Sequence, residues 1–237
     1  MEGNILQKLF SSMWYIRGNH TVTTEGELLY TNYSKNTVYR VTTCSNISVR
    51  KLIETGNWKP GAIYFSHIYG HILVGMGTIL DEKITRYNRE GRKLQDIQCD
   101  NEGQTLYQRV HFITENINGD ICTADSSASK VVVVTASGKY RFSYSGHHSQ
   151  LLFCPYGICT NVLGHILVCN NYFMYNTRYS SVHLLDIDGQ FLSLLLTPKQ
   201  CSPYPCVLCI DNQHNLWVGG WYSSTVSVYK YLQKTEN

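Results

Sequence analysis

The chain has 237 residues, of which 43% are hydrophobic, 12% aromatic and 16% charged. This length accommodates one or two domains, and so many aromatic residues with so few charges exclude an intrinsically disordered chain. The formal net charge of +3, from 20 basic and 17 acidic residues, excludes a strongly basic nucleic-acid-binding protein.

No apolar stretch is long enough for a transmembrane helix, and residues 1–16 lack the continuous apolar run of a signal peptide. We therefore expect a cytoplasmic protein with no membrane partner. The three sequons at Asn19, Asn32 and Asn46 then stay unglycosylated.

A short phrase recurs five times along the chain, every 44–50 residues. Its copies begin at Gly26, Gly70, Gly119, Gly164 and His214. A second apolar phrase follows each copy, beginning at Val38, Ile84, Val131, Val182 and Val226. Further apolar runs precede four copies, at 62–65, 111–113, 157–159 and 207–209, and turn glycines follow at Gly91, Gly138 and Gly189. Four short strands in a repeat of this length predict the blades of a β-propeller rather than a helical solenoid.

The fold prediction is an all-β propeller of five four-stranded blades within one domain, 1–233. Its units span about 17–53, 54–99, 103–146, 150–197 and 198–233, and 234–237 form a tail. The last unit has three strands, and residues 3–9 match 189–195 in pattern. We therefore expect the N-terminal segment 3–9 to supply the missing outer strand and to close the ring.

Nine cysteines, an odd number, occur in a chain with no sign of secretion, which favours buried, reduced thiols over disulfides. A zinc site at Cys201, Cys206 and Cys209, with Cys154 or Cys159, is the alternative. It lacks the second paired knuckle of established zinc motifs.

The segments 115–123, 155–160, 163–168 and 182–192 resemble the NHL-repeat propeller of the tripartite-motif (TRIM) family. The similarity is greatest to invertebrate, mollusc-type proteins that resemble tripartite motif-containing ubiquitin ligases, and it covers about 3–232. Members usually have six blades, so one blade is missing here, and the RING, B-box and coiled-coil segments are absent. The resemblance implies a propeller that recognises substrates for ubiquitination and contains no catalytic centre of its own.

Binding residues in propellers concentrate on loops of one rim. The longest insertion within a unit, 169–181, and its counterpart 219–225 are rich in aromatic residues and arginine, which often anchor interfaces. The alternative is that these rings pack onto their own blade. The predicted partner-binding residues are Tyr172, Phe173, Tyr175, Arg178, Trp221 and Tyr222, joined on the same rim by Trp58, Tyr156 and Tyr204.

Other polar residues receive structural interpretations. We expect His147 and His148 to be solvated, because adjacent side chains point apart. His111 lies on an inner strand and is expected to be a core histidine satisfied by a neighbour. One outer hairpin carries a cluster of basic residues and is expected to be solvated, with mixed charge: Lys83, Arg86, Arg89, Arg92 and Lys93.

Three functions fit this fold. Recognition of a protein partner is preferred, and binding of single-stranded RNA through stacked bases is the alternative. A propeller lyase or lactonase with an axial metal is the third. It needs polar ligands on several inner strands, and those strands offer mainly Ile63, Tyr64, Phe112, Ile158, Cys159 and Leu208. We therefore predict that the chain is not an enzyme and needs no metal, cofactor or small-molecule substrate.

Overall fold

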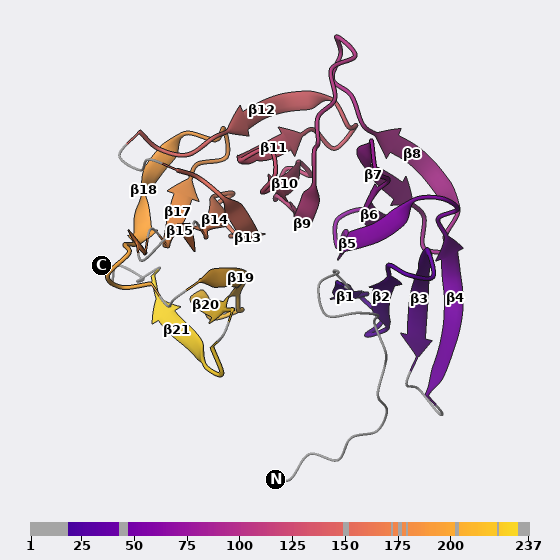
Figure 1. The fold of residues 1–237 in the computed structure, drawn as a ribbon. Coiled ribbons are helices and arrows are strands. Elements are labelled where there is room, and N and C mark those ends of the chain that lie inside the picture. The colour runs from indigo at the N-terminus through magenta and orange to yellow at the C-terminus, as the bar shows by residue number, and fades with distance from the viewer. Residues whose placement is uncertain are drawn as a thin grey trace. The chain divides into compact units, whose positions relative to one another are not determined.

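The computed structural model describes residues 19–42, 47–148, 152–171, 173–174, 177–178, 180–201, 204–221 and 223–231, with the side chains at 173–174 and 177–178 excepted. In this part of the chain the regular structure is entirely β (Figure 1). It contains no helix that could cross a membrane. The chain divides into two compact units, Met1–Ile97 and Gln98–Asn237.

The first unit contains two antiparallel sheets in which each strand pairs with the next one along the chain. The first sheet comprises β1 (His20–Val22), β2 (Leu28–Asn32), β3 (Thr37–Thr42) and β4 (Ser48–Glu54). The second comprises β5 (Lys59–Phe65), β6 (Ile72–Gly77), β7 (Glu82–Tyr87) and β8 (Lys93–Ile97). Both match the predicted four-stranded blade.

Among its described residues, the second unit contains three further antiparallel blade sheets and a separate two-stranded hairpin. The first comprises β9 (Val110–Glu115), β10 (Ile121–Asp125), β11 (Lys130–Val134) and β12 (Tyr140–Tyr144). The next comprises β13 (Pro155–Thr160), β14 (Ile166–Asn170), β17 (Ser181–Leu185) and β18 (Phe191–Leu196), with a two-stranded hairpin, β15 (Phe173–Met174) and β16 (Thr177–Arg178), inserted between β14 and β17. The last comprises β19 (Pro205–Ile210), β20 (Asn215–Gly220) and β21 (Val226–Lys230).

The recurring glycines close the turns between strands. The amide of Gly119 donates to the carbonyl oxygen of Asn116 at 2.8 Å, and that of Gly164 donates to Asn161 at 3.0 Å. Both glycines have a φ of +80°, which residues with a side chain rarely adopt. This is why the first repeated phrase begins with glycine.

The middle strands β11 and β14 are buried on both faces. Val131, Val132, Val133 and Val134 of β11 are each fully buried, as are Ile166, Leu167, Val168 and Cys169 of β14. The sequence of such strands is a continuous apolar run rather than an alternating one, because both faces pack against other side chains. This pattern explains why the repeated phrases were readable from the sequence.

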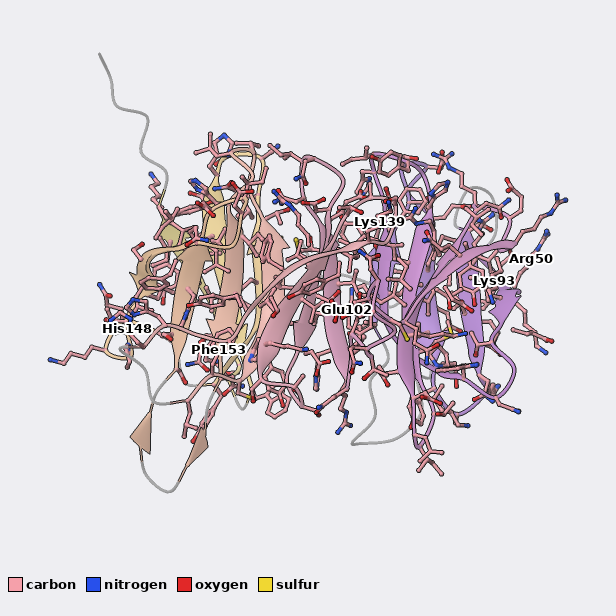
Figure 2. All side chains as sticks on the ribbon, turned by 90° about the horizontal axis from the view of Figure 1, so that it is seen from above. Arg50, Lys93, Glu102, Lys139, His148 and Phe153 are labelled. Atoms are coloured by element: carbon pink, nitrogen blue, oxygen red, sulfur yellow. The ribbon has the colours of Figure 1, made fainter. Side chains whose placement is uncertain are left out.

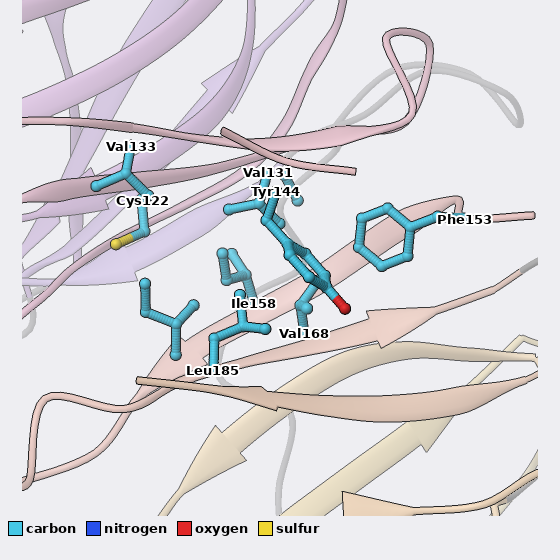
Figure 3. Packing of buried hydrophobic residues seen from close by; sticks show 10 residues of the cluster. Cys122, Val131, Val133, Tyr144, Phe153, Ile158, Val168 and Leu185 are labelled. Carbon is cyan, nitrogen blue, oxygen red and sulfur yellow. The ribbon is translucent and has the colours of Figure 1, made fainter. Parts of the chain in front are cut away.

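In the second unit, one apolar cluster joins the blades that begin with β9 and β13. It contains Cys122 and Val133 from one blade and Ile158, Val168 and Leu185 from the other, and Figure 3 shows these side chains together. In the first unit, a corresponding cluster joins its two sheets through residues such as Leu29, Val38, Phe65 and Ile72. Neighbouring blades within each unit are therefore held together by apolar packing.

Some of the exposed charged side chains lie on outer strands. Figure 2 labels Arg50 of β4 and Lys93 of β8, both exposed. Lys83 and Lys93 share the carboxylate of Asp96, at 3.0 and 2.6 Å, and Arg89 pairs with Glu25 at 2.5 Å. Three members of the predicted basic cluster, Lys83, Lys93 and Arg89, therefore form ion pairs with acidic side chains.

The eight described cysteines are free thiols. Burial raises the pKa of the Cys206 thiol to about 11 and that of Cys201 to about 12. Thiols of this kind pack as small apolar side chains and are poor nucleophiles at neutral pH. The proposed closing strand, residues 3–9, lies outside the described residues, and among those residues β21 pairs only with β20.

Candidate functional site

In the second unit, a fully buried carboxyl group fixes the loops at one end of the blade that begins with β9. Asp125, the last residue of β10, accepts hydrogen bonds from the backbone amides of Gln108 at 2.6 Å, Arg109 at 3.1 Å and Ala128 at 2.9 Å. Because a buried carboxyl group needs such partners, it holds the segment that enters β9 against the loop that follows β10. His111 and Ser126 lie at this junction.

In the next blade, an amide side chain makes the corresponding hydrogen bonds to the backbone. Asn170, the last residue of β14, accepts from the amide of Cys154 at 2.9 Å and donates to the carbonyl oxygen of Leu152 at 3.1 Å. The amide of Asn171 donates to the carbonyl oxygen of Cys154 at 2.9 Å. These bonds fix the entry to β13 and thereby position Tyr156.

In the last blade, the backbone joins the corresponding loops. The amide of Trp221 donates to the carbonyl oxygen of Tyr204 at 2.9 Å. Tyr204 adopts a φ of +56°, which is strained for a bulky residue, and it directly precedes Pro205. The strain costs on the order of 1–3 kcal/mol and persists only where surrounding contacts hold the loop.

These three junctions bring three rings into a row, one from each blade of the second unit. The His111 ring lies 4.8 Å from the Tyr156 ring, and the Tyr156 ring lies 5.2 Å from the Trp221 ring in an edge-to-face arrangement. Trp221 is 48% exposed, and His111 and Tyr156 are partly exposed. We call these three residues the aromatic row.

At one end of the aromatic row, an imidazole and a hydroxyl group are paired. The Oγ atom of Ser126 lies 2.7 Å from Nδ1 of His111. Burial, followed by the positive charge of Arg109, lowers the pKa of His111 to about 4, so the ring is neutral at pH 7. Burial raises the pKa of Tyr156, and a hydrogen bond with the Ser126 side chain opposes this shift.

The structure brings together part of the predicted binding set. Tyr156 and Trp221 touch through their rings, and Tyr204 joins Trp221 through the backbone. Phe173 and Arg178 face each other in the register of the β15–β16 hairpin, but their side chains are outside the described set, and Tyr172, Tyr175 and Tyr222 lie wholly outside it.

Trp58 belongs to the first unit and is described there. Its ring packs against the cluster of Phe65 and Ile72, and the Nζ atom of Lys83 lies 4.1 Å from the ring centre. Lys83 is itself 7% exposed and bonded to Asp96 at 3.0 Å. The Trp58 ring is therefore part of an internal cation–π contact, which is the packing alternative stated for the predicted anchors.

Sequence reasoning missed His111 as a site residue, and it missed Ser126, Arg109 and Asp125 altogether. His111 was expected to be a core histidine with a satisfying neighbour. It does have that neighbour in Ser126, but it also lies in the exposed aromatic row. A usable signal was present, because Asp125 and Asn170 occupy the same position at the end of the second strand of a blade.

The described residues contain no group of three or more His, Cys, Asp and Glu side chains arranged to hold a metal ion. The cysteines of the alternative zinc site, Cys201, Cys206 and Cys209 with Cys154 or Cys159, therefore form no such group. His147 stacks on Phe191 with ring centres 4.0 Å apart, and it also lies 3.9 Å from His148. The expectation that both histidines are simply solvated is incomplete for His147.

No protein-family model matches the chain, and no curated protein sequence matches it either. Solved structures do match. They include a catalytically inactive histidine-to-alanine variant of virginiamycin B lyase from Staphylococcus aureus with quinupristin, at 16% identity over 91% of this chain and 70% of that one, with a TM-score of 0.62. A gluconolactonase from Xanthomonas campestris matches at 14% identity over 85% and 68% of the two chains, with a TM-score of 0.62.

A protein of unknown function from Bacteroides thetaiotaomicron matches at 16% identity over 91% of this chain and 60% of its own, with a TM-score of 0.67. The fold is a β-propeller. The all-β propeller prediction, with five blades of antiparallel strands, is confirmed in these terms. The chain spans 60–75% of the length of the propellers named here and of a putative gluconolactonase that also matches.

The prediction that this chain is not an enzyme is wrong as an inference from its architecture. Propellers of the same fold include virginiamycin B lyase and gluconolactonase, which are enzymes. The sequence argument failed because it looked for polar side chains only within the inner strands. In the structure, polar groups gather at the ends of those strands, as His111, Ser126 and Arg109 do.

Proposed function

We propose that this propeller recognises a protein partner through the aromatic row and the loops beside it. The observation that carries the proposal is the contact between Tyr156 and Trp221, two rings from neighbouring blades of which the second is 48% exposed. Aromatic side chains bury a large area with few rotors, and they are enriched among residues that dominate binding energy.

The chemistry around the row favours an extended peptide with apolar or aromatic side chains. Arg109 is exposed, and its positive charge acts on both His111 and Tyr156, so a carboxylate on the partner is favoured next to the row. The inserted β15–β16 hairpin follows Asn170 and Asn171 directly, which places Phe173 and Arg178 close in sequence to this loop. These two residues are proposed to extend the binding surface.

The finer assignment also belongs to this proposal. The NHL-type resemblance suggests the substrate-recognition end of a tripartite-motif, ubiquitin-ligase-like protein, with residues 3–9 completing the last blade. No family model supports this subclass. Binding of single-stranded RNA is the other outcome that the experiment below distinguishes.

The test compares two exposed tryptophans, Trp221 directly after β20 and Trp217 within β20. Peptides are selected from a random display library against the intact chain, and their affinities are measured for the wild type, Trp221→Ala and Trp217→Ala. Trp217 is 41% exposed, and its Nε1 atom donates to Asp211 at 2.9 Å, so it is a matched control outside the row. Loss of an interface anchor costs about 2 kcal/mol, or about thirtyfold in Kd.

We expect Trp221→Ala to weaken peptide binding by about thirtyfold and Trp217→Ala to leave it within about threefold. Equal affinities of all three proteins would contradict the proposal. A random single-stranded RNA pool is tested in parallel. RNA affinity that falls steeply with salt, together with a failure to select peptides, would favour the RNA function instead.

A further inference from the structure

The pairing of Ser126 with His111 is more than the packing of a core histidine needs. Ser126 lies in the loop that follows β10, and both its side chain and that of His111 are partly exposed. Its Oγ atom is 2.7 Å from Nδ1 of His111 and 3.3 Å from Nε2 of the same ring. The Ser126 side chain also acts on Tyr156, whose pKa it lowers against the larger, opposing effect of burial. The serine oxygen is therefore paired with a neutral imidazole, and both side chains remain partly exposed.

The pair is held rigidly from both sides. Asp125, immediately before Ser126, is fully buried. Its carboxylate accepts hydrogen bonds from the backbone amides of Gln108 and Arg109, which precede His111 in the chain. A hydrogen bond with the Arg109 backbone acts on the His111 ring, and the Tyr156 ring lies 4.8 Å from its other side. An imidazole that is oriented by one neighbour and hydrogen-bonded to a serine hydroxyl is the arrangement that activates a serine nucleophile.

We propose that Ser126 is a nucleophile activated by His111, and that it takes an acyl group from a carboxylic ester carried on an aryl or similarly flat leaving group. The rings of Tyr156 and Trp221 offer the surface on which such a group lies flat. Arg109 is exposed two residues before His111, so its positive charge is available to stabilise the negative charge that develops on the ester oxygen. This inference does not depend on capture of a protein partner.

The chemistry balances without an oxidant, a reductant or a metal. The Oγ atom of Ser126 forms a bond to the carbonyl carbon as its proton moves to the imidazole of His111. The ester C–O bond then breaks, and the leaving oxygen takes that proton and departs as a phenol or alcohol. Water attacks the acyl-serine, again giving its proton to His111, and the C–Oγ bond breaks to release a carboxylic acid and to restore the Ser126 hydroxyl.

The experiment uses p-nitrophenyl acetate as the probe on the intact chain. Release of p-nitrophenolate is followed by absorbance, and peptide mapping by mass spectrometry locates the acetyl group. Ser127→Ala is the matched control, because Ser127 is the adjacent serine and is exposed. His111→Asn and Ser126→Ala remove the base and the nucleophile in turn, and circular dichroism and thermal melting verify that each variant is folded.

We expect acetylation at Ser126 in the wild type and in Ser127→Ala, and its loss in Ser126→Ala. Release of p-nitrophenolate should fall by about a hundredfold or more in Ser126→Ala and His111→Asn, the size of effect typical of a lost catalytic proton transfer. Acetyl groups spread over lysine residues, with release unchanged in Ser126→Ala, would overturn the proposal. If His111→Asn does not fold, the map of the wild type against Ser126→Ala and Ser127→Ala decides alone.

Discussion

His183 is a fully buried histidine whose two ring nitrogens both have partners. Nδ1 lies 2.8 Å from the hydroxyl of Tyr144, and Nε2 lies 3.1 Å from Oγ of Ser181. Aromatic rings surround it, with Phe153 at 5.2 Å and Phe191 at 5.7 Å. A second proton on this ring brings a charge into an apolar cluster, so burial, followed by the charge of His147, lowers the pKa of His183 to about 4.

This pKa makes stability depend on pH. Between pH 4 and 6.5 the unfolded chain binds a proton at His183 that the folded chain does not, so unfolding is favoured as pH falls through this window. The contribution is fully present above pH 6.5 and amounts to about 3 kcal/mol. We expect urea unfolding to show this loss of stability as pH falls from 7 to 4.

The variant His183→Gln isolates the effect. It lowers stability at pH 7 because one or both hydrogen bonds are lost, but it flattens the dependence on pH, since glutamine does not titrate. His111 also has a lowered pKa and stays in both proteins, so the difference between the two curves reports His183 alone. Parallel curves for the wild type and the variant would show that His183 does not carry the pH dependence.

At the scale of the element, the strands were predictable and the loop contacts were not. A glycine before an apolar run indicated the turns at Gly119 and Gly164. The run of valines at 131–134 indicated a strand buried on both faces. The pairing of Ser126 with His111 is different, because it depends on Asp125 accepting amides from a loop 16 to 17 residues earlier in the chain. The repeat places Asp125 and Asn170 at equivalent positions, but the sequence alone does not show which amides Asp125 binds.

Gly157 in β13 is another position whose role only the structure explains. A Cβ atom built there meets the carbonyl oxygen of Cys206 at 2.8 Å and the Cα atom of Val207 at 2.9 Å, both in the backbone of β19. The first strands of two neighbouring blades in the second unit therefore approach each other through this glycine. The backbone of β19 has to move to admit a side chain, since no flexible group is in the way.

We expect Gly157→Ala to lower the free energy of unfolding by about 1–3 kcal/mol, the usual cost of overpacking. Gly219→Ala in β20 is the matched control, because its nearest atom is the Cβ of Val207 at 3.8 Å, an ordinary contact. That variant should change stability by no more than about 0.5 kcal/mol. Chemical denaturation of both proteins measures the difference, and equal stabilities would mean that β13 and β19 do not approach this closely.

At the scale of the whole molecule, the last blade is the least complete among the described residues. β21 pairs with β20 along one edge only, and one face of this sheet shows exposed apolar side chains, with Val226 at 59%, Val228 at 48% and Trp217 at 41%. An unpaired strand edge with apolar neighbours is usually covered in a stable protein. The sequence suggests a strand to cover it, because residues 3–9 match residues 189–195 around β18, the fourth strand of the preceding blade.

If residues 3–9 supply that fourth strand, removing them affects the cooperative unfolding of the chain rather than one frayed end. We expect deletion of residues 1–10 to lower stability by about 2 kcal/mol or more, which corresponds to a fall in Tm of roughly 4–8 °C for a domain of this size. Deletion of the four-residue tail 234–237 is the control and should leave Tm unchanged. Differential scanning calorimetry measures both melting temperatures. A chain without residues 1–10 that melts at the wild-type temperature would rule out closure by the N-terminal strand.

Hydrogen exchange adds an independent readout, because loss of a paired neighbour exposes the outward amides of β21. Their protection should therefore fall when residues 1–10 are deleted and stay unchanged when the tail 234–237 is deleted.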